Sequence, residues 1–167
     1  EQVRVEEKPE KAQARPELPS PSVFARKIAE KKFVVSVELD PPAGTDPAGI
    51  VESAKKLRKA NVDAVNIADG PRATARMNPT ALALLIREDS GMETIVHYCC
   101  RDRNLLGMQS DLIGANALGL YNILIVTGDP PKMGDYPFAT AVFDVDSIGL
   151  TKIARNLNTG LDLAGNP

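Results

Sequence analysis

The alternation of short apolar strands with amphipathic helices constrains the fold of this chain more than any other feature of its sequence. Runs rich in β-branched residues predict strands over residues 33–38, 62–67, 93–98 and 122–127. Apolar residues at helical spacing predict helices over residues 47–60, 78–89, 104–118 and 147–157. Asp46 and Asp146 precede the first and last of these helices and are suited to cap them.

Repeated strand–helix units predict an α/β fold with parallel strands and right-handed crossovers. Two architectures satisfy this pattern, namely an open doubly wound sheet and part of a (β/α)8 TIM barrel. The first strand ends in Glu-Leu-Asp-Pro-Pro instead of a Gly-rich phosphate turn, and the chain contains no Walker A sequence. We therefore favour the barrel, with about the first four βα units present.

The first 21 residues differ in composition from the rest of the chain. Residues 1–21 are rich in Glu, Lys, Pro and Gln, which predicts a disordered linker or tail, although a trimmed terminus would look the same. Residues 22–167 form the predicted domain. A formal net charge of −2 gives no basic surface for nucleic acid, and the longest apolar stretch, residues 118–126, is too short to span a membrane.

Two adjacent cysteines, Cys99 and Cys100, are the only ones in the chain. Neighbouring residues on a strand point to opposite faces, so a structural disulfide is disfavoured and a cytoplasmic location is expected. With His97 they are too closely spaced for ordinary zinc ligation, and no metal site is predicted.

Each predicted strand ends in polar residues, and the carboxyl ends of parallel strands meet at one rim. Glu38 ends the first strand, Asp69 follows the second, His97 ends the third, and Asp129 follows the fourth. The sequence therefore predicts three carboxylates and an imidazole around one site.

Each of these residues also has a structural interpretation. Glu38 could form a salt bridge at the rim, His97 could be a hydrogen-bonded structural residue, and Asp129 before two prolines could fix a turn. The charged residues 101–103 are interpreted as a solvated cluster that caps the next helix.

Three segments, residues 97–107, 122–131 and 143–149, resemble methylenetetrahydrofolate reductase. The likeness is closest to the bacterial subgroup that carries this domain behind a homocysteine S-methyltransferase domain. The resemblance covers residues 22–167 and implies the N-terminal half of the reductase barrel. Residues 1–21 would then be the linker between the two domains.

The resemblance implies a barrel that holds FAD at its C-terminal mouth. NAD(P)H would reduce the flavin, which would then reduce 5,10-methylenetetrahydrofolate to 5-methyltetrahydrofolate in one-carbon metabolism and methionine biosynthesis. Glu38 matches the family's general acid, and Asp129 matches the aspartate beside the flavin and the pterin. The positions matched to FAD contacts are Asp69, His97, Thr127, Gly128, Asp129 and Asp144.

The chain departs from the best-known members at Leu39-Asp40, at Ala68-Asp69 and at Thr127, which stands where an arginine is common. The resemblance also implies that the remaining half of the barrel is needed, so this chain alone is expected to be weak or inactive. Two alternatives remain open. One is a truncated, non-catalytic half-barrel that acts as an assembly or interaction module, and the other is an aldol-type lyase, which would need a lysine or a metal cluster at a strand end.

Overall fold

The computed structural model describes residues 21–167, and apart from Pro21 the predicted linker lies outside the described residues. The four predicted strands are present as β1 Ser36–Leu39, β2 Ala64–Ile67, β3 Thr94–Cys99 and β4 Asn122–Val126. The helices are α1 Val23–Ala29, α2 Ala48–Lys59, α3 Pro79–Ser90, α4 Leu105–Ala117 and α5 Ser147–Asn158. Two short 3-10 helices, η1 Pro71–Ala73 and η2 Pro131–Met133, lie in the loops after β2 and β4.

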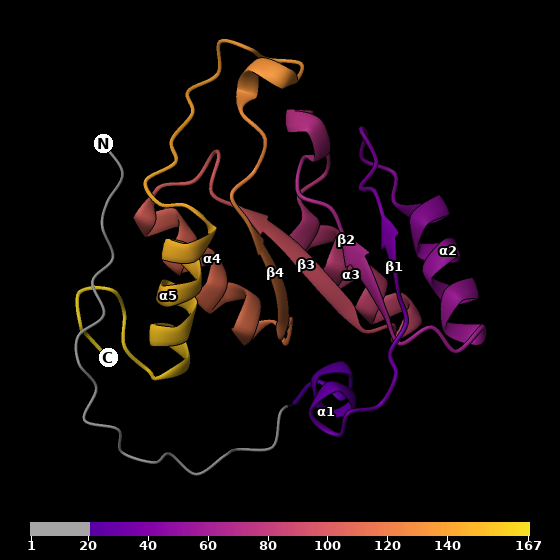
Figure 1. Ribbon diagram of the computed structural model, residues 1–167. Helices are drawn as coiled ribbons and strands as arrows, with labels where there is room; N and C mark the ends of the chain where they lie inside the picture. The colour runs from indigo at the N-terminus through magenta and orange to yellow at the C-terminus, as the bar shows by residue number, and fades with distance from the viewer. Residues whose placement is uncertain (1–20) are drawn as a thin grey trace.

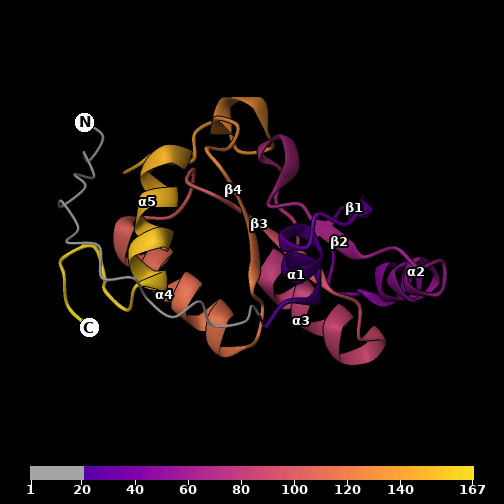
Figure 2. The same cartoon turned by 60° about the horizontal axis from the view of Figure 1, so that its bottom comes forward.

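The four strands form one sheet in the order β1-β2-β3-β4, and every neighbouring pair is parallel. Helices α2 to α5 form an arc along one side of this sheet (Figures 1 and 2). A doubly wound sheet reverses its strand order and carries helices on both faces. The sequential order and one-sided helices therefore exclude that alternative for the described residues and are consistent with part of a barrel.

The core lies between the sheet and the helices. Val65, Ile67 and Val96 are fully buried on the helix side of the sheet, where they belong to one apolar cluster with Leu82 and Ile86 of α3. A second cluster joins the end of β3 to α4 and α5 through Tyr98, Cys100, Met108, Val145, Leu150 and Ile153. Alternation along each strand then directs the intervening residues to the opposite face.

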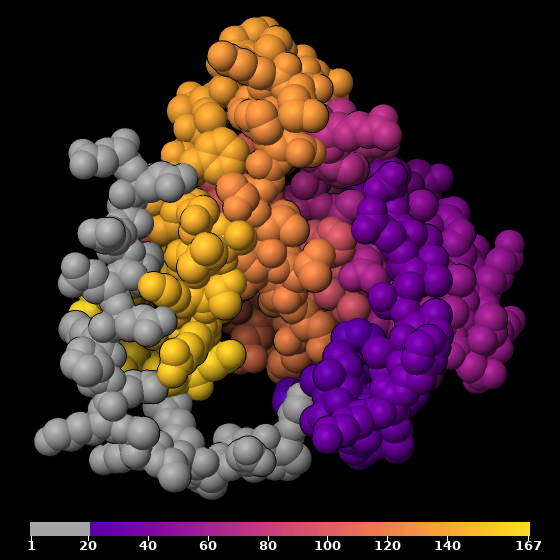
Figure 3. All heavy atoms as spheres, viewed as in Figure 1, coloured from indigo at the N-terminus to yellow at the C-terminus, as the bar shows by residue number. Residues whose placement is uncertain are grey.

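That opposite face, which we call the inner face, carries Glu38, Asn66, His97 and Leu124. The register supports this grouping, because Glu38 pairs with Asn66 and His97 pairs with Leu124. Leu124 is 43% exposed, and the space-filling view shows the sheet uncovered between α5 and β1 (Figure 3). The inner face is thus accessible along the sheet.

Helix α1 was not predicted from the sequence, and it has only seven residues, none of them buried. Its first residues fasten it to the amino ends of the strands, because the Ser22 hydroxyl donates to Asn122 at 2.7 Å and the Val23 N–H donates to Glu93 at 3.2 Å. Lys27 forms an ion pair with Asp63. Helix α1 therefore lies at the end of the sheet opposite the polar strand ends (Figure 1).

The two predicted helix N-caps, Asp146 and Asp46, both accept a hydrogen bond at the start of their helices. Asp146 caps α5 as predicted and accepts the Gly149 N–H at 2.8 Å. The prediction for α2 is wrong by one residue, because Pro47 occupies the N-cap position. Asp46 still accepts the Ala48 N–H at 2.9 Å, so it supports the start of that helix from one residue earlier. Within residues 21–167, no helix has the length and apolar character needed to cross a membrane.

Candidate functional site

The polar strand ends line one pocket of about 360 Å³ at the carboxyl end of the sheet, which we call the carboxyl-end pocket. Its lining residues come from β1, β3 and β4 and from the turns after β2, β3 and β4: Glu38, Ala68, Asp69, Gly70, Pro71, His97, Arg101, Val126, Gly128 and Asp129. Five predicted site residues are therefore brought together. Thr127 and Asp144 are not among the lining residues.

Two carboxylates of the pocket, Glu38 and Asp129, are exposed. Neither forms an ion pair within residues 21–167, so the structural interpretation of Glu38 as a rim salt bridge is not supported. Both side chains can therefore contact a ligand without first losing a charged partner.

His97 is half-buried on the inner face, and its Nε2 lies 3.3 Å from Asn66 Oδ1. The amide nitrogen of Asn66 donates to the Ser36 hydroxyl at 2.8 Å, which leaves its oxygen for His97. This network favours the tautomer with the proton on Nε2. Burial lowers the pKa of His97, while Glu38 and Asp69 act in the opposite direction. His97 is therefore neutral at pH 7, with Nδ1 available as an acceptor.

Asp69 differs from the other two pocket carboxylates because protein groups already bind it. Its side chain is 6% exposed, accepts the Cys99 N–H at 2.9 Å and pairs with both terminal nitrogens of Arg103, at 2.7 and 3.4 Å. Arg103 also lies over the Tyr98 ring at 4.5 Å and reaches Asp111 at 3.3 Å. Burial lowers the pKa of Arg103, but the interactions with Asp69, Asp102 and Tyr98 together outweigh burial, and the net shift is upward. Asp69 thus anchors a buried ion pair beside the pocket.

The interpretation of residues 101–103 as a solvated cluster is wrong for both arginines. The Arg101 side chain is 8% exposed and the Arg103 side chain 15%, whereas Asp102 is 51% exposed. Arg101 lines the carboxyl-end pocket, and the sequence analysis did not select it. Its position shortly after the third strand was the available signal, because the same argument selected the other strand ends.

Backbone conformation shapes the pocket at two glycines. Gly128 has φ +96°, and a Cβ there would lie 3.0 Å from the Cβ of Cys99. Gly70 has φ +53°, and a Cβ there would lie 2.6 Å from a terminal nitrogen of Arg101. Both positions favour glycine, because other residues rarely adopt this φ and each added carbon would crowd a neighbour. Gly128 therefore keeps the turn after β4 close against β3.

Thr127 and Asp144 support helices instead of lining the pocket. The Thr127 hydroxyl accepts the Ser147 N–H at 3.1 Å, at the first residue of α5. Asp144 accepts the Leu105 N–H at 3.0 Å, at the first residue of α4. Their contacts with a cofactor remain predictions, and in this structure each satisfies a free N–H at a helix start.

Both cysteines are fully buried and behave as small apolar residues. Burial is the main cause that raises the pKa of Cys99 to about 12 and that of Cys100 to about 11. Their thiols are therefore protonated at neutral pH and are poor nucleophiles. Among the described residues, no group of three or more His, Cys, Asp or Glu is arranged to hold a metal ion.

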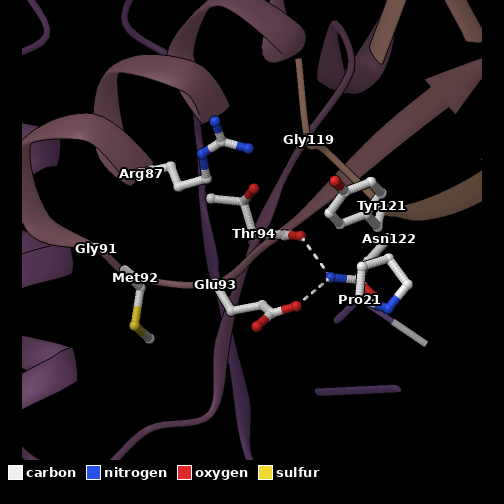
Figure 4. Close-up of a pocket in the computed structure, with 9 residues that line it drawn as sticks. All are labelled: Pro21, Arg87, Gly91, Met92, Glu93, Thr94, Gly119, Tyr121 and Asn122. Atoms are coloured by element: carbon white, nitrogen blue, oxygen red, sulfur yellow. Dashed lines mark hydrogen bonds between the residues drawn. The ribbon is translucent and has the colours of Figure 1, made fainter. Parts of the chain in front are cut away.

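A second pocket, of about 220 Å³, lies at the opposite end of the sheet (Figure 4). Its polar groups bind one another, because the Asn122 amide donates to Glu93 at 3.0 Å and to the Thr94 carbonyl at 3.1 Å. In parallel α/β folds, ligands bind at the carboxyl ends of the strands. This amino-end pocket therefore has a structural role, and the carboxyl-end pocket is the candidate site.

Comparison with known proteins places the chain in a family. The family model described as methylenetetrahydrofolate reductase matches residues 23–157, which include β1 to β4 and all residues of the carboxyl-end pocket. No curated protein matches the chain. The pocket offers unpaired carboxylates, a neutral imidazole and backbone groups at one rim, an arrangement suited to moving a proton and orienting a polar heterocycle.

Proposed function

Because the chain belongs to the methylenetetrahydrofolate reductase family, we propose that its carboxyl-end pocket takes part in the reduction of 5,10-methylenetetrahydrofolate to 5-methyltetrahydrofolate with FAD and NAD(P)H. The observation that carries this proposal is the meeting of Glu38, His97 and Asp129 in one pocket. A reductase of this kind needs a proton donor and hydrogen-bonding groups around stacked heterocycles, and these side chains supply both.

The dimensions of the pocket are compatible with the flavin ring. A volume of about 360 Å³ lies at the lower end of the range for small-molecule sites, so it can hold one ring system but not a whole dinucleotide. Gly128 lines the pocket without a side chain, and the Nδ1 of His97 can accept a hydrogen bond. When bound, FAD would supply the hydride chemistry, while the protein orients the reactants.

Glu38 is proposed as the general acid. A carboxyl group can protonate a folate nitrogen and so open the methylene bridge for reduction, provided that it lies within hydrogen-bond reach of that nitrogen. Glu38 is available for this role, because it lines the pocket and has no ion-pair partner among the described residues. Asp129, at the opposite edge of the sheet, is proposed as the acceptor that orients the pterin.

The open inner face suggests that further βα units complete the site. A barrel has no exposed sheet edges, whereas β1 and β4 each have one side without a neighbouring strand in residues 21–167. We propose that additional units cover the inner face and hold the rest of FAD, the folate and NAD(P)H. A homocysteine S-methyltransferase domain joined through residues 1–21 and a cytoplasmic location belong to the same proposal.

A second candidate function is that of a non-catalytic assembly module. The uncovered inner face favours this alternative, because an exposed apolar residue such as Leu124 on a sheet can bind another protein surface. The two candidates differ in their requirement for Glu38, which an assembly module does not need.

The test is the Glu38→Gln variant of the protein as cells produce it. Reduction of the flavin by NAD(P)H and reduction of the folate by the flavin are measured separately. Reduction of the flavin by NAD(P)H should continue at the wild-type rate, because that step needs no proton from Glu38. Folate reduction should fall by roughly 10²-fold or more, the usual contribution of a general acid. Equal loss of both half-reactions would contradict the proposed role.

Glu52→Gln is the matched control, because Glu52 is an exposed glutamate on α2 that pairs only with Lys55 among the described residues. Both half-reactions of this variant should match those of the wild type. If Glu38→Gln reduced the folate at the wild-type rate, another group would be the proton donor and the proposed role of Glu38 would be wrong.

A further inference from the structure

Arg101 is a buried cation with no role in the chemistry described so far. Its side chain is 8% exposed, and it lines the carboxyl-end pocket together with Gly70 and Asp129. Burying a charged group is costly unless partners compensate for the lost water. The partners of Arg101 therefore indicate whether its charge is already used within the protein.

The guanidinium of Arg101 has few and long hydrogen bonds. It donates to the Gly70 carbonyl at 3.3 Å and to Asp102 at 3.5 Å, although a guanidinium carries five N–H donors. Arg103, two residues later, forms a 2.7 Å bond to Asp69 and a 3.1 Å bond to Asp102. Asp102 is therefore shared, and its shorter bond is to Arg103.

No other carboxylate of the pocket neutralises Arg101. Within residues 21–167, its only carboxylate partner within 4.0 Å is Asp102, which is 51% exposed. Glu38 and Asp129 line the same pocket but form no ion pair with it, and Asp69 pairs with Arg103. Arg101 therefore contributes a positive charge to the pocket lining, and no buried carboxylate lies close to it within residues 21–167.

Gly70 makes room for this arrangement. A Cβ at Gly70 would lie 2.6 Å from a terminal nitrogen of Arg101, so the guanidinium occupies the space that a side chain would fill. The turn after β2 is left-handed at Gly70 and again at Arg72 and Ala73, both with φ 56°. Such conformations in residues other than glycine are unfavourable, and they cluster at binding sites.

We propose that Arg101 is an oxyanion-binding residue, and that it takes a phosphate or carboxylate group of a ligand bound in the carboxyl-end pocket. The planar fork of a guanidinium matches two oxygens of such a group, and burial makes these charge-assisted bonds stronger than they would be in water. Within the proposed function, the group has two possible sources, namely the phosphates of FAD and the carboxylates of the folate.

The first test uses inorganic phosphate and does not depend on the proposed function. Backbone amide resonances of the isotope-labelled protein are followed during a phosphate titration at constant ionic strength. Saturable shifts are expected at Gly70 and Arg101 in the wild type and should disappear in Arg101→Met. The absence of saturable shifts at these amides, or identical shifts in Arg101→Met, would overturn the proposal.

Two further variants keep this test decisive. Arg76→Met removes the same charge from the loop after β2, but Arg76 is exposed and does not line the pocket, so the phosphate response of this variant should be unchanged. Arg101→Lys retains a buried charge without the fork and guards against misfolding of Arg101→Met. It should bind phosphate more weakly than the wild type, and wild-type binding by this variant would overturn the role of the guanidinium fork.

The second test identifies the source of the oxyanion. The dissociation constants of FAD, riboflavin and 5-methyltetrahydrofolate are compared in the wild type and Arg101→Met. Loss of roughly 10-fold or more for FAD, with riboflavin unchanged, would assign the cofactor phosphate, and the same loss for the folate alone would assign its carboxylates. Equally weakened binding of riboflavin and FAD, or unchanged binding of both FAD and the folate, would overturn the proposal.

The two tests also separate this proposal from the proposed function. If the wild type bound neither flavin nor folate, the proposed function would fail, and the phosphate titration would still decide the role of Arg101.

Discussion

At the scale of single residues, the three carboxylates at the carboxyl end of the sheet divide by their partners. Asp69 is buried against Arg103, whereas Glu38 and Asp129 are exposed without ion pairs in the described residues. A paired carboxylate stabilises local structure, and an unpaired one in a pocket can act on a ligand. This difference separates a structural acid from two candidate functional acids.

Replacement of Asp69 should be the most destabilising change to a charged residue near the site. Asp69→Ala leaves the buried Arg103 without its main partner, and removing one member of a buried pair costs about 3–5 kcal/mol. The midpoint of urea unfolding should therefore fall clearly. Lys55→Met is the control, because it removes only surface ion pairs, with Glu52 on α2 and Asp89 on α3, and should change the midpoint little. Equal effects of the two changes would contradict the buried ion pair.

His97 should make stability depend on pH in a predictable direction. Its pKa in the folded protein is lowered from the ordinary value of 6.5, mainly by burial. The unfolded chain therefore binds a proton first as pH falls, and the stabilising contribution is present above about 6.5 and is lost on acidification below it. Stability measured at pH 7.5 and 5.5 should show this loss, and His97→Gln should reduce it.

Because His97 is the only histidine of the chain, its titration can be followed directly by proton NMR. The folded protein should titrate below 6.5. A pKa at or above that value would contradict the burial of the ring.

At the scale of elements, the strands and the four long helices were predictable because their apolar spacing is regular. Helix α1 was not, because it has only seven residues and is held by polar bonds to residues distant in sequence, such as Asn122 and Glu93. Arg101 was missed for a related reason. The two residues that follow it, Asp102 and Arg103, are charged, and the packing of the turn after β2 against its guanidinium shows that Arg101 is buried.

The N-cap of α3 should make a measurable contribution to stability. Asn78 accepts the N–H groups of Thr80 and Ala81 at 2.9 and 3.1 Å, and loss of such a cap costs about 1 kcal/mol. Asn78→Ala should lower the free energy of unfolding by this amount. Asn116→Ala, at an exposed position of α4, is the control and should be near neutral. Similar values for both variants would argue against the cap.

The contact between the loops after β2 and β4 should depend on Gly134. A Cβ at this position would overlap the backbone of Ala73, which is rigid compared with a side chain. Gly134→Ala should therefore separate η1 from η2 and weaken ligand binding in the pocket below them. Gly49→Ala in α2 meets nothing within 4 Å and should be neutral or stabilising, since alanine favours helix. Unchanged ligand affinity in Gly134→Ala would show that the loop contact does not shape the pocket.

At the scale of the whole molecule, sequential strand order and one-sided helices leave an inner face that is polar at its carboxyl end and apolar at Leu124. The sequence predicted that Glu38, Asp69, His97 and Asp129 meet at the rim, because the ends of parallel strands must converge, but it did not predict Arg101. It did not predict which carboxylate is already paired, since the partner of Asp69 lies 34 positions away in the chain.

The visible spectrum of the protein, purified in the form that cells produce and titrated with FAD, tests the central claim most directly. The account predicts flavin absorption bands that shift on binding, and much weaker binding by residues 1–167 alone, because no element within residues 21–167 covers the inner face. Tight FAD binding by residues 1–167 would contradict the need for further βα units. A protein that is colourless as purified and gains no bound flavin bands at saturating FAD would contradict the assignment of the carboxyl-end pocket as a flavin site.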